Sequence, residues 1–204
     1  MNPLLRTDRL LLTPYTPADE EEFVALFQDA SVSRWMGDGP STEAEDRALF
    51  GRIFTKVYAE NRFEVWAVKV GGELVGHAEI KPTEASGGHE IIYALAPGAW
   101  GRGLGTELAL ALVGHGFDTL GLAEVHATVA AENAASLAVL GRIGFVHVRD
   151  IQEDDGSITR LLTCPRTSAP AAERVVRAAE AQSAQVRTAE AQTTDVQTAE
   201  AQTP

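Results

Sequence analysis

A glycine-rich turn joins an extended segment to a helical one at residues 89–106, which read HEIIYALAPGAWGRGLGT. β-Forming residues at its start favour a strand, Pro97-Gly98 signals a turn, and apolar residues from Leu104 onward recur at helical spacing. At the first turn of a helix, free backbone N–H groups and the helix dipole attract an anion. Glycine has no Cβ, so backbone can come within hydrogen-bond distance of a phosphate. The spacing therefore predicts a pyrophosphate cradle on Gly101, Gly103 and Gly105.

Two common phosphate-binding loops are excluded by the letters of this stretch. A Walker loop ends in GK[ST], and no lysine separates Gly105 from Thr106. A dinucleotide fingerprint needs G-x-G-x-x-G, and after Gly101 and Gly103 the third glycine would have to stand at Thr106. The expected pyrophosphate therefore belongs to a ligand other than those bound by a Walker loop or a dinucleotide fingerprint.

The pattern that remains, W-G-R-G-L-G-T after Leu-Ala-Pro, resembles the acyl-CoA loop of the GNAT N-acetyltransferases. Within that superfamily it resembles the Rim-type branch, which includes ribosomal-protein N-terminal acetyltransferases. The superfamily pattern is [Q/R]-x-x-G-x-[G/A]; Trp100 holds the Gln/Arg position here, a departure that is usual in the Rim-type branch. The segment 133–145 resembles a second Rim-type pattern, N-x-x-S followed at fixed spacing by G-F. The resemblance covers roughly residues 4–164 and implies acetyl-CoA as co-substrate.

Cofactor contacts follow from the resemblance. A backbone N–H near Leu95 or Ala96 would polarise the thioester carbonyl. Asn133 would bond the pantetheine arm, and a plain helix cap is an equal alternative. The loop residues expected to contact the cofactor are Trp100, Gly101, Arg102, Gly103, Leu104, Gly105 and Thr106, with Arg102 as a cation for phosphate.

The reaction that the resemblance implies also needs a base. An alkyl amine has a pKa of about 10, so it must lose a proton before it attacks a thioester. Glu90 lies in the strand that leads into the cradle, where the resemblance places an acid acting directly or through water. The alternative is a solvent-facing strand residue. His89 would point to the opposite face, because side chains alternate along a strand.

The leaving thiolate needs a partner as well. Many superfamily members place a tyrosine in the last helix, in a Y-x-x-x-G-F context, and that position is Leu140 here. Ser136, one helical turn upstream, is the substitute that the Rim-type branch suggests, and its alternative is an ordinary helix-start serine. The histidines His77, His115 and His126 show no metal-ligand spacing, so no metal is implied.

The elements that position these residues follow an α+β plan, because three antiparallel strands precede the helix of the cradle. We expect a GNAT-like mixed, mainly antiparallel sheet of six to seven strands with about four helices. Thr16-Pro17 begins one helix, and Thr42 with Glu45 forms a capping box for a second that extends to about residue 60. Further strands are expected at 10–15, 63–70, 73–81, 124–129, 145–151 and 157–164.

The acceptor is a primary amine by the resemblance, attacked directly in a ternary complex without an acyl-enzyme. A protein N-terminus, a polyamine, an amino acid or an aminoglycoside all stay open, and so does a non-catalytic acyl-CoA-binding regulator. Trp35 and Met36 would lie near the acceptor mouth or, equally well, in the core.

Composition limits the partners. A net charge of -12 argues against nucleic acid and favours a cationic acceptor or partner. No apolar run is long enough to span a membrane. Cys164 is the one cysteine, so no internal disulfide forms, a reducing, cytoplasmic location is expected and the residue fits the core. A homodimer stays open.

The composition changes after residue 165. Aromatic residues vanish, and a ten-residue unit repeats as RAAEAQSAQV from Arg177 and RTAEAQTTDV from Arg187. Such a polar repeat has too little apolar surface to form a core. We therefore expect one acetyltransferase-like domain at 1–165 and a low-complexity, disordered tail at 166–204.

Overall fold

A computed structural model of the chain describes residues 2–37 and 39–168. Within these residues it shows one eight-stranded sheet in the order β1-β2-β3-β4-β5-β6-β8-β7. Neighbouring strands are antiparallel except β5 and β6, which run parallel. The strands are β1 Leu5–Arg6, β2 Leu11–Thr13, β3 Glu64–Val70, β4 Glu73–Pro82, β5 His89–Leu95, β6 Glu124–Ala130, β7 Val146–Gln152 and β8 Ile158–Pro165.

The α+β, mainly antiparallel plan is thus confirmed. The strand count exceeds the expected six to seven because β1, only two residues long, pairs with β2. Two residues are too few to show an alternating pattern. The predicted tail lies outside the described residues from 169 onward. Arg166, which we placed at its start, donates from its main-chain N–H to the Ala123 carbonyl and from its side chain to the Phe117 carbonyl.

Five α-helices occur in the described part of the chain, one more than expected. They are α1 Glu20–Gln28, α2 Ala30–Ser33, α3 Glu43–Arg52, α4 Leu104–Asp118 and α5 Ala134–Arg142. A π-helical segment, Ile53–Tyr58, continues α3, so the predicted second helix does reach about residue 60. Short 3-10 turns occupy Pro17–Asp19, Pro97–Ala99 and Arg166–Ser168. The Thr42–Glu45 capping box is present, whereas α2 is a single turn with no periodicity to predict it.

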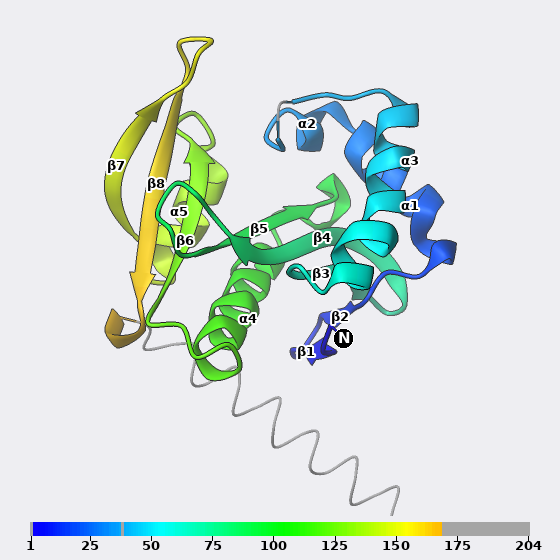
Figure 1. Cartoon of the computed structure of the whole chain (residues 1–204), viewed down its shortest axis with the longest axis horizontal. Helices are drawn as coiled ribbons and strands as arrows, with labels where there is room; N and C mark the ends of the chain where they lie inside the picture. Colours follow the sequence, from blue (N-terminus) through cyan, green and yellow to red (C-terminus); the bar gives the residue numbers. More distant parts are fainter. Residues whose placement is uncertain (1, 38, 169–204) are drawn as a thin grey trace, which may run out of the picture.

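Helices cover both faces of the sheet, and β3 shows how the sequence divides between them. Its Val65 and Ala67 belong to the core formed with α1 and α3, while Trp66 and Val68 belong to the core formed with α4. This alternation is what a strand buried on both faces requires. Figure 1 shows α1 and α3 grouped at one side of the molecule, β6, β7 and β8 at the other, and β4 and β5 between them.

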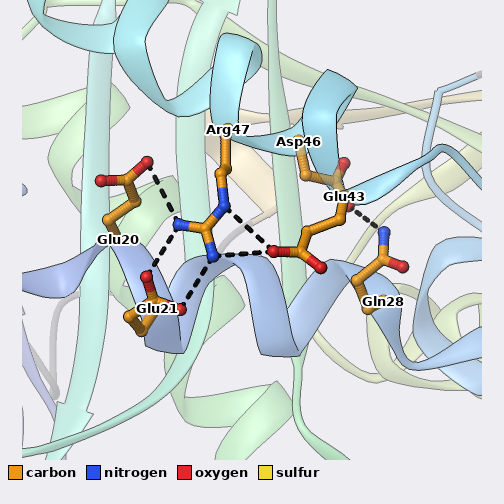
Figure 2. A network of polar contacts seen from close by, with 6 residues as sticks. All are labelled: Glu20, Glu21, Gln28, Glu43, Asp46 and Arg47. Carbon is orange, nitrogen blue, oxygen red and sulfur yellow. Dashed lines mark hydrogen bonds and ion pairs between the residues drawn. The ribbon is translucent and has the colours of Figure 1, made fainter.

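A charged network ties α1 to α3. Figure 2 shows Arg47 of α3 reaching Glu20 and Glu21 of α1 and Glu43 of its own helix. Two nitrogens of Arg47 contact the two Glu21 oxygens at 2.8 and 2.9 Å, a bidentate geometry that fixes orientation. Arg47 and Glu20 are half-buried and Glu21 and Glu43 are exposed, so we expect these ion pairs to stabilise the fold less than the aromatic packing beneath them. There the ring centroids of Phe23 and Phe50 lie 5.1 Å apart.

The pairing of β5 is strongly unequal on its two sides. It pairs with β4 along its whole length, from Pro82 opposite His89 to Gly76 opposite Leu95. With β6 it shares one register position, Glu90 opposite His126. Beyond that position the two parallel strands diverge, and this divergence opens the sheet.

Gly76 lets β4 approach β5 closely opposite the open end. A Cβ at this position would clash with the carbonyl oxygen of Ala94 and come within 2.7 Å of Leu95 Cδ2. We expect Gly76→Ala to lower the free energy of unfolding by about 1–3 kcal/mol, as overpacking does. Urea denaturation measures it.

Gly51→Ala is the control, because its Cβ in α3 would meet nothing within 4 Å and alanine favours a helix. Equal stability of Gly76→Ala and the wild type would contradict this packing.

Candidate active site

A cavity of about 830 Å³ lies where β5 and β6 diverge. Residues 91–95 of β5 and 127–130 of β6 line it, together with residues at the beginnings of α4 and α5 and residues 31, 32 and 34–36 at α2. Its size suits a small-molecule or cofactor site. The predicted site residues that line it are Leu95, Trp100, Gly101, Gly103, Leu104, Gly105, Thr106, Asn133 and Ser136.

The glycine turn presents bare backbone at the start of α4. Gly101 has φ +69° and Gly103 has φ +77°, in the left-handed region that favours glycine. Gly103 is the N-cap of α4 and supplies no side-chain cap, whereas Asn133 caps α5 through the Ser136 N–H at 3.1 Å. The first N–H groups of α4 have no helical acceptor, and the residues that carry them line the cavity. This end of α4 can bind an anion.

Arg9 links the glycine turn to the first turn of α4 through hydrogen bonds. Its Nη1 donates to the Arg102 carbonyl at 2.7 Å, and its Nε donates to Glu107 Oε2 at 2.7 Å. Thr7 Oγ1 donates to the other Glu107 oxygen at 2.5 Å. Burial alone would raise the pKa of Glu107, but the hydrogen bonds from Thr7 and Arg9 lower it instead. Arg9 therefore balances the one acid in the first turn of α4, beside the proposed phosphate position.

The main-chain hydrogen bonds distinguish the Leu95 N–H from the Ala96 N–H, the two candidate donors to the thioester carbonyl. The Ala96 N–H donates to the Val75 carbonyl of the chain preceding Gly76 at 2.8 Å, so it is not free to polarise a thioester carbonyl. Successive residues of an antiparallel strand bond to opposite sides, so the Leu95 groups face the cavity edge. On that edge the Leu95 carbonyl accepts a hydrogen bond from Trp100 Nε1 at 2.6 Å. Leu95 is the one of the two whose N–H points into the opening.

Glu90 lies at the closed end of the opening, at the one register position where β5 pairs with β6. It is 7% exposed, and its carboxylate accepts a hydrogen bond from Thr128 Oγ1 at 2.8 Å. Glu90 itself does not line the cavity, whereas Thr128 does.

Buried Asp46 is satisfied by hydrogen bonds from Gln28 Nε2 and Ser41 Oγ, whereas two other buried or partly buried carboxylates have cations. Asp19 lies 2.6 Å from Lys69 Nζ, and Glu107 contacts Arg9. No ion pair within 4.0 Å is found for Glu90 among the described residues. A structural ion pair therefore does not explain this buried acid.

Near the start of α5 the structure places the expected Ser136 and one further hydroxyl group, that of Tyr93. Leu140, at the usual tyrosine position, is 1% exposed and packs in the core. Ser136 lines the cavity, and its Oγ lies 3.2 Å from the hydroxyl of Tyr93 on β5. The sequence motifs do not single out Tyr93, although its alternation with Ile91 and Leu95 in the strand predicts that it faces the same side as they do, toward α4.

Residues around α2 form the far rim of the cavity. Trp35 and Met36 both line it, together with Arg34, whose guanidinium carbon lies 4.7 Å from the centroid of the Trp35 ring. Arg102 and Ala96, expected as cofactor contacts, do not line the cavity.

His77 and His115 each have a separate hydrogen-bond partner. His77 Nδ1 lies 3.0 Å from the Tyr15 hydroxyl, and His115 Nε2 lies 2.6 Å from Glu64 Oε2. No cluster of three or more metal-ligating side chains occurs in residues 2–37 and 39–168. In the same residues, no helix is both long and apolar enough to cross a membrane. Cys164 is buried in the core.

Comparison with known proteins identifies the class of this fold and site. The acetyltransferase (GNAT) domain profile matches residues 9–146. The chain is 34% identical over 151 residues to the uncharacterized N-acetyltransferase YoaA of Bacillus subtilis, covering 71% of this chain and 84% of that one. The chain therefore belongs to the GNAT acetyltransferase family.

Two further relatives extend the comparison. The chain is 30% identical over 155 residues to the FsC-acetyl coenzyme A-N(2)-transacetylase of Aspergillus fumigatus, covering 72% of this chain and 66% of that one. Its fold is similar to that of Mycobacterium smegmatis RimJ in complex with CoA-disulfide. That similarity has a TM-score of 0.71 at 24% identity, over 86% of this chain and 93% of the other.

The cradle predicts a specific loss of cofactor affinity. Valine at position 103 would be forced into a left-handed conformation or would turn the first N–H groups of α4 away, at a cost on the order of 1–3 kcal/mol. We expect Gly103→Val to abolish CoA binding in calorimetry while the protein stays folded.

Gly121→Val is the matched control, because Gly121 has φ +68° and open space and follows the opposite end of α4. It should lose similar stability and keep its affinity. Unchanged CoA affinity in folded Gly103→Val would remove the cradle from the account.

Proposed function

We propose that the protein is an acetyl-CoA-dependent N-acetyltransferase of the Rim-type branch, which transfers an acetyl group to a primary amine by direct attack in a ternary complex. The observation that carries this proposal is the shared cavity: the uncapped start of α4 and the open edges of β5 and β6 face the same space. An elongated ligand with an anionic end and an amide-containing arm fits such a surface. A CoA complex among the similar folds supports the same choice.

The chain's own residues divide the work of holding acetyl-CoA. The N–H groups at Gly103, Leu104 and Gly105 meet the pyrophosphate, and Arg102 adds a cation from outside the cavity. The pantetheine arm lies along β5, where unpaired main-chain groups replace the missing β6 ladder. Asn133 uses its oxygen for the cap of α5, so its side-chain N–H₂ is the group left for the arm.

The reaction needs three groups placed around the thioester. The amine enters from the α2 rim, and its proton passes to Glu90 through the Thr128 hydroxyl or an adjacent water. The Leu95 N–H stabilises the charge that develops on the thioester oxygen. When the C–N bond has formed, the C–S bond breaks and Ser136 receives the thiolate.

We propose a primary amine as the acceptor, on either a protein N-terminus or a small molecule. The relatives include an enzyme named as an FsC transacetylase, and the similar folds include a spermidine N-acetyltransferase of Vibrio cholerae at 17% identity. A thiol-release assay with acetyl-CoA and a panel of peptides, polyamines and amino acids ranks these classes. It also separates an enzyme from a non-catalytic CoA-binding regulator. The cytoplasmic location and a homodimer stay predictions.

The base assignment predicts a pH-dependent defect. Glu90→Gln keeps the shape of the side chain, so CoA affinity should be unchanged. Loss of a positioned base typically lowers the rate by about 10²–10⁴-fold. The defect should shrink as pH rises toward the pKa of the amine, because more of the acceptor is already neutral.

Glu124→Gln is the control, since Glu124 lies on the same face of β6 as Thr128 but outside the cavity. Steady-state rates across pH for both variants give the answer. A defect of equal size at every pH would deny Glu90 the role of base.

A further inference from the structure

Two hydroxyl groups face each other on the cofactor side of the cavity. Tyr93 comes from β5 and Ser136 from the first turn of α5, 43 residues later, and both line the cavity. Their oxygens lie 3.2 Å apart, and no other hydrogen bond to either hydroxyl is found within the described residues. Each oxygen therefore has hydrogen-bonding capacity left for a ligand between the two elements.

The strand fixes the face on which this pair lies. Tyr93 is at an odd position of β5 with Ile91 and Leu95, and all three pack with the core around α4. Glu90 and Ala94 are at even positions, and Ala94 packs with the core around α1 and α3. The hydroxyl pair and the carboxylate thus lie on opposite faces of the same strand.

We propose that Tyr93 and Ser136 act together as the proton donor to the leaving CoA thiolate, with Ser136 in contact with the sulfur and Tyr93 supplying the proton through it. This inference rests on the proposed acetyl transfer. When the C–S bond breaks, its electron pair stays on sulfur. The Ser136 O–H proton moves to that sulfur and the Tyr93 O–H proton moves to Ser136; solvent later returns a proton to Tyr93, and Glu90 releases the amine proton to solvent, so that the two balance. The amine proton leaves separately, to Glu90.

A serine alone is a poor donor of this proton, because an alkyl hydroxyl is far less acidic than a phenol, whose pKa is about 10. Burial raises the pKa of Tyr93, and the hydrogen bond with Ser136 lowers it only in part, so Tyr93 is protonated at neutral pH. The pair also explains how Leu140 can stand at the usual tyrosine position of α5. Tyr93 of β5 supplies a phenol that lines the same cavity. Tyr93 acts through Ser136, so it is a positioning and proton-supplying residue.

The test uses CoA itself and needs no acceptor. Ultraviolet absorbance of the thiolate gives the pKa of the thiol in CoA bound to the full-length protein, and the same titration of free CoA gives the reference value. Two hydroxyl donors should lower this pKa in the wild-type complex. Tyr93→Phe and Ser136→Ala should each raise it by about one unit, and the double variant by little more, because the two act in series.

Tyr58→Phe is the matched control for loss of a partly buried hydroxyl, because Tyr58 donates to the Val65 carbonyl at 3.0 Å and lies outside the cavity. It should leave the thiol pKa unchanged. Calorimetry on each variant checks that CoA still binds. In turnover, Tyr93→Phe should lower kcat at least tenfold with the KM for acetyl-CoA unchanged.

The outcomes separate this inference from the function on which it rests. If the wild type binds CoA and Tyr93→Phe binds it with the same affinity and the same thiol pKa, Tyr93 has no role in the leaving group. A thiol pKa raised in Ser136→Ala alone would overturn the relay and leave a serine acting by itself. Failure of the wild type to bind CoA would overturn the proposed function and this inference together.

Discussion

One register position holds the two halves of the sheet together at the site, because β5 and β6 pair only where Glu90 lies opposite His126. Past that point β5 and β6 no longer pair with each other, although β5 stays paired with β4 and β6 with β8. Buried N–H and C=O groups without partners are costly, so an edge of this kind persists only if other groups satisfy it. Trp100 satisfies the Leu95 carbonyl, and the amide groups of a bound pantetheine arm would satisfy others. The same divergence that weakens the sheet creates the binding surface.

The alternation of β5 then distributes the chemistry. Glu90 lies on the face toward α1 and α2, where the amine enters in the proposed function, and Tyr93 lies on the face toward α4 and α5, where that proposal holds the cofactor. A base and an acid on opposite faces of one strand would not neutralise each other, and each would act on a thioester between the strands through a second hydroxyl, Glu90 through Thr128 and Tyr93 through Ser136. Different environments for paired titratable groups are what acid–base catalysis requires.

Much of this arrangement could be predicted from the sequence where the signals are local. The change from strand to helix at the glycine turn, the Thr42–Glu45 capping box and the strands on either side of the turns depend on neighbours a few residues away. Contacts between distant segments could not be predicted in this way. Arg9 meets Glu107 across 98 residues, and Tyr93 meets Ser136 across 43. Their meeting depends on sheet register and helix placement, which no short pattern encodes.

The same limit explains why two choices stay open in the sequence. Leu95 and Ala96 were equal candidates by sequence, because the choice depends on which N–H the register directs to β4. The helix α2 places Trp35 and Met36 at the cavity rim, yet a single turn has no periodicity to reveal it.

The central claim, that the arm and pyrophosphate of CoA occupy the opening between β5 and β6, is tested most directly by amide chemical shifts during titration of the ¹⁵N-labelled protein with CoA. We expect the amides of Leu95, Gly101, Gly103, Leu104 and Gly105 to shift together with one dissociation constant. The amide of Gly156, in the turn between β7 and β8, should stay unchanged as an internal reference. CoA binding that leaves the amides at Leu95 and the start of α4 unshifted, or that shifts only residues outside the cavity, would contradict it.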